Sequence, residues 1–307
     1  MIKTKAIRKI FVTTLTLFIL LTAYSIPNTN NEKVLRTNME IKENNLDLTT
    51  NIYLLNEDNF LVQTKIILDT SDKIEQIKKI IESLRIKEEK DNNNLSGVIH
   101  KNVKVNNILY KDKIITIDFS KELQENKYSR VLIESLVYSI MELDDIKGLI
   151  LSVDGLILEN YNSLPTVLNK EIGINIKYEL TKLSDIEKVV MYYISELNDK
   201  LYYVPVTRYL NDDREKITII VEQLSSSYIY EDNLMSFLNS NIKLLDFEEK
   251  ENILFLNFND YLFSKDNKVV EEVIYAISYS VFANYDVSSV YFEVNNEIVK
   301  QVFKEDL

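Results

Sequence analysis

The chain lacks cysteine and tryptophan, and its 307 residues include only four glycines, three prolines and one histidine. Without cysteine there is no disulfide, no thiolate metal site and no thiol nucleophile. The single histidine, His100, excludes a site built from several histidines, and we expect it in a solvated loop. The glycines are too far apart to form a loop that cradles phosphate groups. We therefore expect no metal ion, no cofactor and no catalytic residue.

Acidic residues outnumber basic ones. The 48 aspartates and glutamates against 36 lysines and arginines give a net charge of −12. Nucleic-acid binding requires a basic face that releases counterions from phosphate groups, so we exclude nucleic acid as a partner. Anionic membrane surfaces would also repel the chain. Any membrane attachment should then be hydrophobic and confined to the N-terminal segment.

The N-terminal residues have the pattern of an export signal. Four basic residues occur before position 10, and an apolar run over 10–24, shorter than a comfortable membrane span, follows them. We interpret 1–25 as a signal peptide or an N-terminal membrane anchor, and the polar stretch 26–49 as a tether. The rest of the chain is expected outside the cytoplasm, either secreted or anchored.

The remainder of the sequence repeats itself. The segment 134–155 aligns without gaps with 275–296, and shorter blocks upstream keep their apolar positions in phase. Agreement between separate blocks indicates two copies of one domain. We place the first copy at 50–158 and the second at 189–301, joined by a structured bridge at 159–188.

Each copy has the periodicities of a mixed α/β domain. Apolar residues alternate in the strands and recur at three- and four-residue spacing in the helices. The first copy predicts, in order, strands at 52–55 and 61–68, a helix at 74–84, strands at 103–110 and 114–119, a helix at 129–143 and a strand at 149–153. The order β-β-α-β-β-α-β predicts an α+β fold, a sheet with helices on one face. In the bridge we expect a strand at 174–178 and a short helix near 184–189.

These blocks resemble the GerMN domain family, whose domain occurs in tandem in sporulation proteins. The resemblance lies in the segments 105–123, 132–155 and 203–208, and it depends on order and spacing because none of them contains a catalytic signature. It implies a sporulation or spore germination protein in the space between the two membranes that enclose a forespore. The expected role is a non-enzymatic scaffold or assembly factor, whose partners are other envelope or sporulation proteins.

The sequence departs from the family pattern in three places. Gln63 stands in the first copy where the second has Pro205. The second copy ends in two asparagines, 295–296, where the first has Asp154 and a glycine. The cysteine that carries a lipid in the family is missing, which excludes attachment by lipid.

A second function depends on carboxylates. Two of them at a suitable separation could hydrolyse a glycosidic bond, so the alternative is a protein that binds peptidoglycan or remodels the spore cortex, as a carboxylate-dependent hydrolase would. However, Asp118 aligns with Asn257, Asp154 with Asn295, and Glu134 with a tyrosine. Because these carboxylates are not kept in the second copy, we favour the non-enzymatic function.

Four residues are candidates for contact with a partner. Arg208 is the single basic residue of an apolar strand that also contains Tyr203, in a region rich in tyrosine. Asp118 lies inside another apolar strand, and Asp154 begins the turn that ends the first copy. The simpler interpretations are an exposed strand charge for Arg208 and, for Asp118, a solvent-facing strand residue or a hydrogen bond to the following turn.

Overall fold

The computed structural model describes residues 48–87, 94–125, 130–159, 163–225, 233–263 and 269–307. The predicted targeting segment, 1–25, lies outside these residues, as does the predicted tether apart from its last two positions. Within the described part of the chain, no helix is long and apolar enough to cross a membrane.

Both repeats contain the predicted strands and helices in the predicted order, but each ends in a further strand, and the first has a further short helix, that were not predicted. The first repeat comprises β1 (Leu48–Leu55), β2 (Leu61–Leu68), α2 (Lys73–Ser83), β3 (Val105–Lys111), β4 (Ile114–Phe119), α3 (Glu122–Glu125), α4 (Arg130–Ile140), β5 (Gly148–Val153) and β6 (Leu156–Ile157). The second comprises β8 (Ile186–Leu197), β9 (Lys200–Asn211), α5 (Lys216–Ser225), β10 (Leu244–Lys250), β11 (Ile253–Phe258), α6 (Glu271–Asn284), β12 (Ser289–Val294) and β13 (Glu297–Phe303). The α+β class and the tandem repeat are confirmed.

The single sheet expected in each repeat is wrong, because the strands form two. The hairpin β1–β2 is one sheet, and β3-β4-β5-β6 is the other, with β4 and β5 parallel. Serine side chains of α4 take the place of a further strand beside β1. Ser139 Oγ accepts from the Tyr53 backbone N–H at 3.0 Å, and the Ser135 hydroxyl donates to the Tyr53 carbonyl at 2.7 Å. A helix that satisfies an edge in this way stops the sheet from growing.

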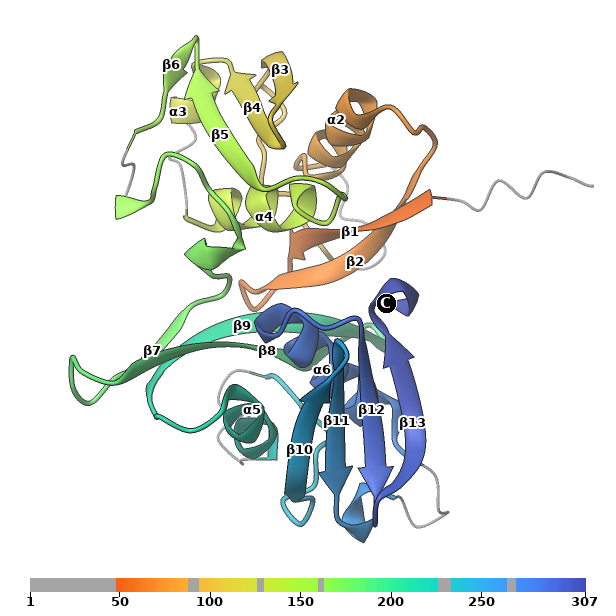
Figure 1. Ribbon diagram of the computed structural model, residues 1–307. Coiled ribbons are helices and arrows are strands. Elements are labelled where there is room, and N and C mark those ends of the chain that lie inside the picture. Colours follow the sequence, from red (N-terminus) through yellow and green to blue (C-terminus); the bar gives the residue numbers. More distant parts are fainter. Residues whose placement is uncertain (1–47, 88–93, 126–129, 160–162, 226–232, 264–268) are drawn as a thin grey trace, which may run out of the picture. The chain divides into compact units, whose positions relative to one another are not determined.

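The second repeat is built in the same way. Its hairpin β8–β9 is joined to the bridge strand β7 (Lys177–Glu179), while β10-β11-β12-β13 forms the four-stranded sheet. Ser280 Oγ of α6 accepts from the Tyr192 backbone N–H at 2.9 Å, as Ser139 does for Tyr53. Figure 1 shows α4 and α6 each between the hairpin and the four-stranded sheet of its own repeat.

The bridge differs from its prediction in one element. A short helix was expected near 184–189, but β8 begins at Ile186 and continues to Leu197. The apolar run that starts at Val189 pairs with β9 along its whole length, and this pairing overrides the weak local preference for a helix. The strand expected at 174–178 is present as β7, displaced toward Glu179.

The two repeats meet through equivalent residues. The hydroxyl oxygens of Tyr53 and Tyr192 lie 3.4 Å apart, and these tyrosines occupy matching positions of β1 and β8. Asn56 Nδ2 and Ser195 Oγ, again a matching pair, are 3.5 Å apart. An interface in which each position meets its own counterpart has the pattern of a twofold dimer. The repeats are therefore related by a pseudo-twofold axis.

Each of the two hydrophobic cores includes residues from outside its own repeat. Phe60 and Val62 of β2 and its preceding turn pack in the core of the second repeat, and Ile172 and Ile174 of the bridge pack in the core of the first. Each repeat thus depends on apolar side chains from outside its own boundaries for part of its core.

Candidate interaction surfaces

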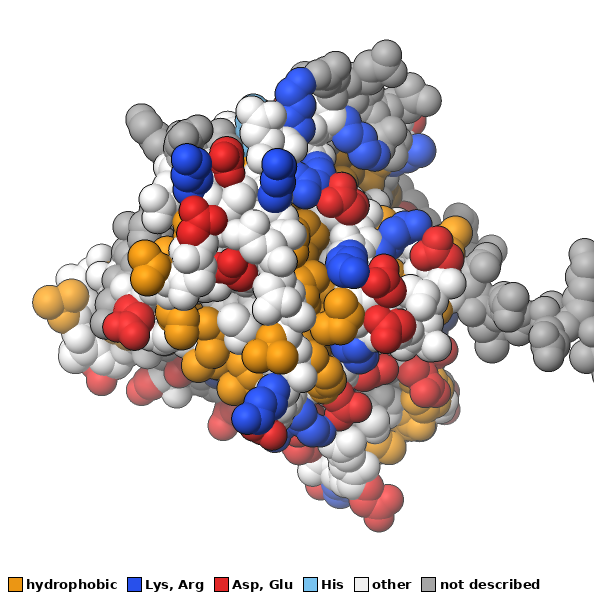
Figure 2. Space-filling view, turned by 90° about the horizontal axis from the view of Figure 1, so that it is seen from above, with side chains coloured by type: hydrophobic (Ala, Val, Ile, Leu, Met, Phe, Trp, Pro, Cys, Tyr) orange, Lys and Arg blue, Asp and Glu red, His pale blue; other side chains and the backbone are white. Residues whose placement is uncertain are grey.

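The outer face of the first four-stranded sheet carries exposed apolar residues. In β4, Ile115, Ile117 and Phe119 are buried, so alternation turns the intervening side chains outward. Leu109 of β3 pairs with an outward position of β4 and is 53% exposed. Ile157 of β6, on the same face, is 49% exposed. Figure 2, which looks onto the end of the molecule that carries β3 to β6, shows hydrophobic side chains gathered between charged ones.

The same face of the second repeat is aromatic. Phe255 of β11 and Tyr291 of β12 pair in register, with ring centroids 5.1 Å apart. Tyr291 in turn meets Phe303 of β13 at 6.4 Å. The exposed Ile298 lies on the same face, in register with Glu293. Both outer faces therefore present apolar groups to solvent, aliphatic in one repeat and aromatic in the other.

The structure brings Asp118 and Asp154 together at one end of the first sheet. Asp118 accepts hydrogen bonds from the Ser152 hydroxyl at 2.7 Å and from the Gly155 N–H at 2.8 Å. Asn106 Nδ2 donates to both carboxylates, at 3.1 and 3.2 Å. Desolvation raises the pKa of Asp118, but these three hydrogen bonds outweigh it and hold the pKa below its usual value.

In the second repeat, asparagines form the corresponding hydrogen bonds. Asn257 donates to Asn296 Oδ1 at 2.9 Å, and Asn295 donates to Asp260 Oδ1 at 2.7 Å. Asn257 Oδ1 also accepts from the Asn296 N–H at 3.4 Å, as Asp118 does from the Gly155 N–H. The penultimate residue of β4 or β11 therefore bonds to the turn after the neighbouring parallel strand in both copies. Since an amide replaces the carboxylate without loss of this contact, the negative charge of Asp118 is not what holds the turn.

Arg208 is not the exposed strand charge that the sequence suggested. Its guanidinium pairs with Glu179 of the bridge and donates to the Tyr193 hydroxyl at 3.0 Å and to Gln223 Oε1 at 2.6 Å. Three partners from three elements fix the side chain, which joins β7 and α5 to the hairpin β8–β9.

Tyr203 is half-buried and lies beside the second helix of its own repeat. Its ring centroid is 4.8 Å from that of Tyr279 in α6, and it lines a shallow hollow of about 360 Å³ together with Tyr275. Desolvation, followed by the charges of nearby tyrosines and glutamates, raises the pKa of its hydroxyl. The neutral phenol can donate or accept a hydrogen bond at the rim of this hollow.

The carboxylates that a hydrolase would need are engaged elsewhere. Glu134 lies inside α4, where it accepts from Arg130 at 2.8 Å and from the Asn175 N–H at 2.9 Å. Desolvation raises the pKa of Glu134 despite these two donors. Asp118, in contrast, is on the outer face of β4 and is tied to the turn that follows β5. Among the described residues, no cluster of three metal-ligating side chains occurs.

One residue that the sequence did not single out connects the two repeats. The side chain of Asn175 accepts from the Leu61 N–H at 2.9 Å and donates to the Leu61 and Pro205 carbonyls at 2.8 and 2.7 Å. Its φ of 48° lies in the left-handed region that asparagine tolerates. The one sequence feature that could have indicated its role is its position as a lone asparagine in an apolar stretch. The sequence does not show where its hydrogen-bond partners lie.

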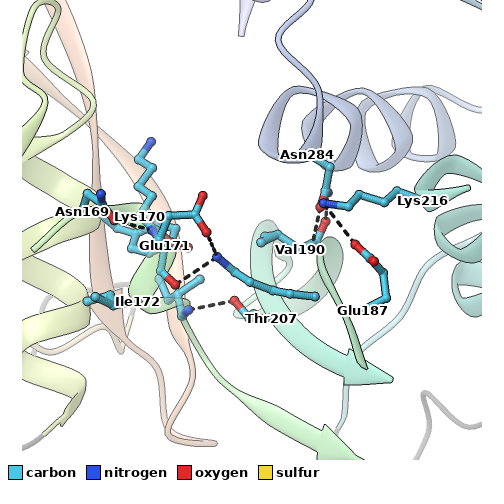
Figure 3. A network of polar contacts seen from close by, with 12 residues as sticks. Asn169, Lys170, Glu171, Ile172, Glu187, Val190, Thr207, Lys216 and Asn284 are labelled. Carbon is cyan, nitrogen blue, oxygen red and sulfur yellow. Dashed lines mark hydrogen bonds and ion pairs between the residues drawn. The ribbon is translucent and has the colours of Figure 1, made fainter. Parts of the chain in front are cut away.

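The bridge is held by further polar contacts, drawn in Figure 3. Lys188 of β8 donates to the side chain of Glu171 at 2.6 Å and to its carbonyl at 3.0 Å. Thr207 Oγ1 accepts from the Ile174 N–H at 2.8 Å. These bonds fasten the bridge to the second repeat, while Glu134 of α4 fastens it to the first.

A comparison with known protein families agrees with the two repeats. The family model for Germane, described as sporulation and spore germination, matches residues 51–159 and again 190–300. The chain belongs to this family. Each repeat is thus one Germane domain, and the resemblance to tandem GerMN proteins is confirmed.

One relative of this Germane protein is from Bacillus subtilis, and its tandem GerMN domains have a solved structure. The spore germination protein GerM is 25% identical over 218 residues, which are 67% of this chain and 60% of GerM. The chain thus matches less than two thirds of the length of that relative. The solved tandem GerMN domains of GerM superpose with a TM-score of 0.72 at 23% identity, covering 81% of this chain and 92% of theirs. At that identity the similarity shows a shared fold.

Proposed function

We propose that this Germane protein is an exported, non-enzymatic scaffold or assembly factor in spore formation or germination, and that it binds envelope proteins through the outer faces of its four-stranded sheets. The observation that carries the proposal is the apolar exposure of both faces, aliphatic around Leu109 and aromatic around Tyr291. Apolar groups surrounded by charged ones are typical of surfaces that meet other proteins.

Membership of the Germane family supports a role in spore formation or germination. The fold supports binding to other proteins as the way in which the chain acts. What the two repeats share is the arrangement of their strands, helices and interface. Their outer faces differ in chemistry, so one chain can present two different surfaces. The strands β3 and β10 are at the ends of their sheets, where a partner strand could add through backbone hydrogen bonds.

Site-specific crosslinking in sporulating cells tests the proposal. A photoreactive amino acid placed at Leu109 or Tyr291 of the full-length chain should capture a defined set of envelope proteins. The matched control is Leu183, which is 92% exposed but lies in the connection between β7 and β8, away from both faces. Capture of the same proteins from position 183, or none from either face, would refute it.

Two further assays address export and catalysis. A C-terminal reporter that is active only outside the cytoplasm should give signal with the full-length chain. Purified protein incubated with spore peptidoglycan should release no soluble fragments, with or without added divalent metal. Release that is lost in Glu134→Gln or Asp118→Asn would instead support the hydrolase.

A further inference from the structure

The repeats carry different residues at several matching positions, and two of these positions lie beside Tyr53 and Tyr192. Asn51 of β1 corresponds to Val190 of β8, and Gln63, opposite Tyr53, corresponds to Pro205, opposite Tyr192. The first repeat thus places two amide side chains where the second has apolar ones. Because cross-strand partners share a face, Asn51, Tyr53 and Gln63 lie on one face of the hairpin β1–β2.

Both amides contain a buried oxygen that lacks a donor. The Gln63 residue is 8% exposed, and among the described residues neither Gln63 Oε1 nor Asn51 Oδ1 has a hydrogen-bond partner. A buried acceptor without a donor costs about 1–3 kcal/mol, so the free protein is destabilised at this place. The apolar residues at the corresponding positions show that the fold does not require the amides.

Both side chains line a cleft between the repeats, with a volume of about 700 Å³. This volume is in the usual range for sites that bind small molecules. Tyr53, Tyr192 and Tyr279 contribute to its walls. Glu142, two residues after the end of α4, accepts from the Tyr53 hydroxyl at 3.1 Å and from Asn51 Nδ2 at 3.4 Å.

Four lysines line the cleft together with four side-chain carboxylates, and three of the lysines form ion pairs. Lys170 pairs with Glu142 at 2.6 Å, and Lys188 pairs with Glu171 at 2.6 Å. Lys216 pairs with a glutamate of β8 at 3.2 Å, on the side of the cleft shown at the right of Figure 3. An anionic ligand would therefore gain little from these cations while facing the carbonyl and carboxylate oxygens of the wall.

The ligand that satisfies this wall donates several hydrogen bonds, is close to neutral, and has an apolar side that can lie against tyrosine rings. Sugar rings combine hydroxyl donors with C–H faces, which meets all three requirements. We propose that the cleft between the repeats binds a saccharide, with Gln63 Oε1 and Asn51 Oδ1 accepting hydrogen bonds from it. This inference goes beyond assembly through the outer sheet faces, because the cleft and those faces use different residues.

Titration of the purified full-length chain tests this site, with chitotriose and cellotriose as saccharide probes and inorganic phosphate as the anionic probe. We expect at least one saccharide to bind, and phosphate not to bind. Gln63→Met keeps the length of the side chain and removes the acceptor, while Asn51→Val copies the second repeat. Each should weaken saccharide binding about tenfold, which corresponds to about 1.4 kcal/mol, one hydrogen bond.

Gln124→Met, an exposed glutamine of α3 outside the cleft, is the matched control and should bind as the unaltered chain does. Circular dichroism confirms folding, and if Gln63→Met fails to fold, Asn51→Val alone decides the outcome. The proposal is overturned if neither saccharide binds, or if the folded cleft variants bind as tightly as the control. Loss of binding in a variant that still crosslinks from position 109 would separate this site from the proposed assembly function.

Discussion

Replacing Asn175 should loosen the junction between the repeats without changing either fold. Asn175→Gly keeps the left-handed backbone, which glycine adopts freely, and removes the amide that bonds to Leu61 and Pro205. Leu61 is fully buried, so its N–H and C=O would both lose their partner. With about 1–3 kcal/mol for each unsatisfied buried group, we expect a loss of about 3 kcal/mol in the free energy of unfolding.

Asn252 provides the matched control for backbone effects. It also has a positive φ, 68°, but it lies exposed in the turn between β10 and β11. Asn252→Gly should cost a few tenths of a kcal/mol up to about 1 kcal/mol, from the greater freedom of the unfolded chain. Asn175→Ala should be worse than Asn175→Gly by about 1–2 kcal/mol, because alanine is strained at positive φ.

Urea unfolding followed by circular dichroism measures these differences, and hydrogen exchange at the Leu61 amide reports the lost bond directly. We expect exchange at Leu61 to accelerate in Asn175→Gly while amides in the centre of β11 remain protected. If Asn175→Gly costs no more than Asn252→Gly, the amide does not connect the repeats and the reasoning is refuted.

Three further predictions follow from single contacts. Burial raises the pKa of Glu134, so between its unfolded value and the raised folded value the native state binds more protons, and stability should fall as pH rises through this window. Glu134→Gln should flatten that decline in urea melts at several pH values. Phe60→Ala should cost about 3 kcal/mol and release exchange protection in the second repeat, whose core contains this ring, whereas the exposed Ile157→Ala should have little effect. Asp118→Asn should preserve the turn after β5, as Asn257 does in the second repeat, whereas Asp118→Ala should raise backbone exchange at Gly155.

The repeat and the order of its elements could be predicted because they depend on local periodicity. Burial in β4 and β11 alternates as their apolar residues do. The division into two sheets could not be predicted. Ser135 and Ser139 look like ordinary helix positions in the sequence, and their bonds to the backbone of Tyr53 depend on a contact across more than 80 residues.

For the candidate residues, too, local periodicity predicted the strand position but not the contacts made with distant parts of the chain. The alternation of the strand placed Asp118 on the outward face, and that placement is correct. For Arg208 the strand was predicted, but its partner Glu179 is in the bridge, whose pairing with β9 has no signature in the sequence. Asn175 was missed for the same reason, since its importance lies entirely in the two strands that meet beside it.

Fusion of the two repeats into one chain allows matching positions of their interface to carry different residues. In a dimer of identical domains, a change such as valine to Asn51 would appear on both sides of the twofold axis and double its cost. In a tandem chain it appears once. Tyr53 and Tyr192, which meet across the axis, are retained as tyrosines, while the neighbouring pairs Asn51 and Val190, and Gln63 and Pro205, differ. The tyrosine pair at the centre of the interface is thus retained. The residues beside it can differ between the repeats, so that at these positions the first repeat has amide side chains and the second has apolar ones.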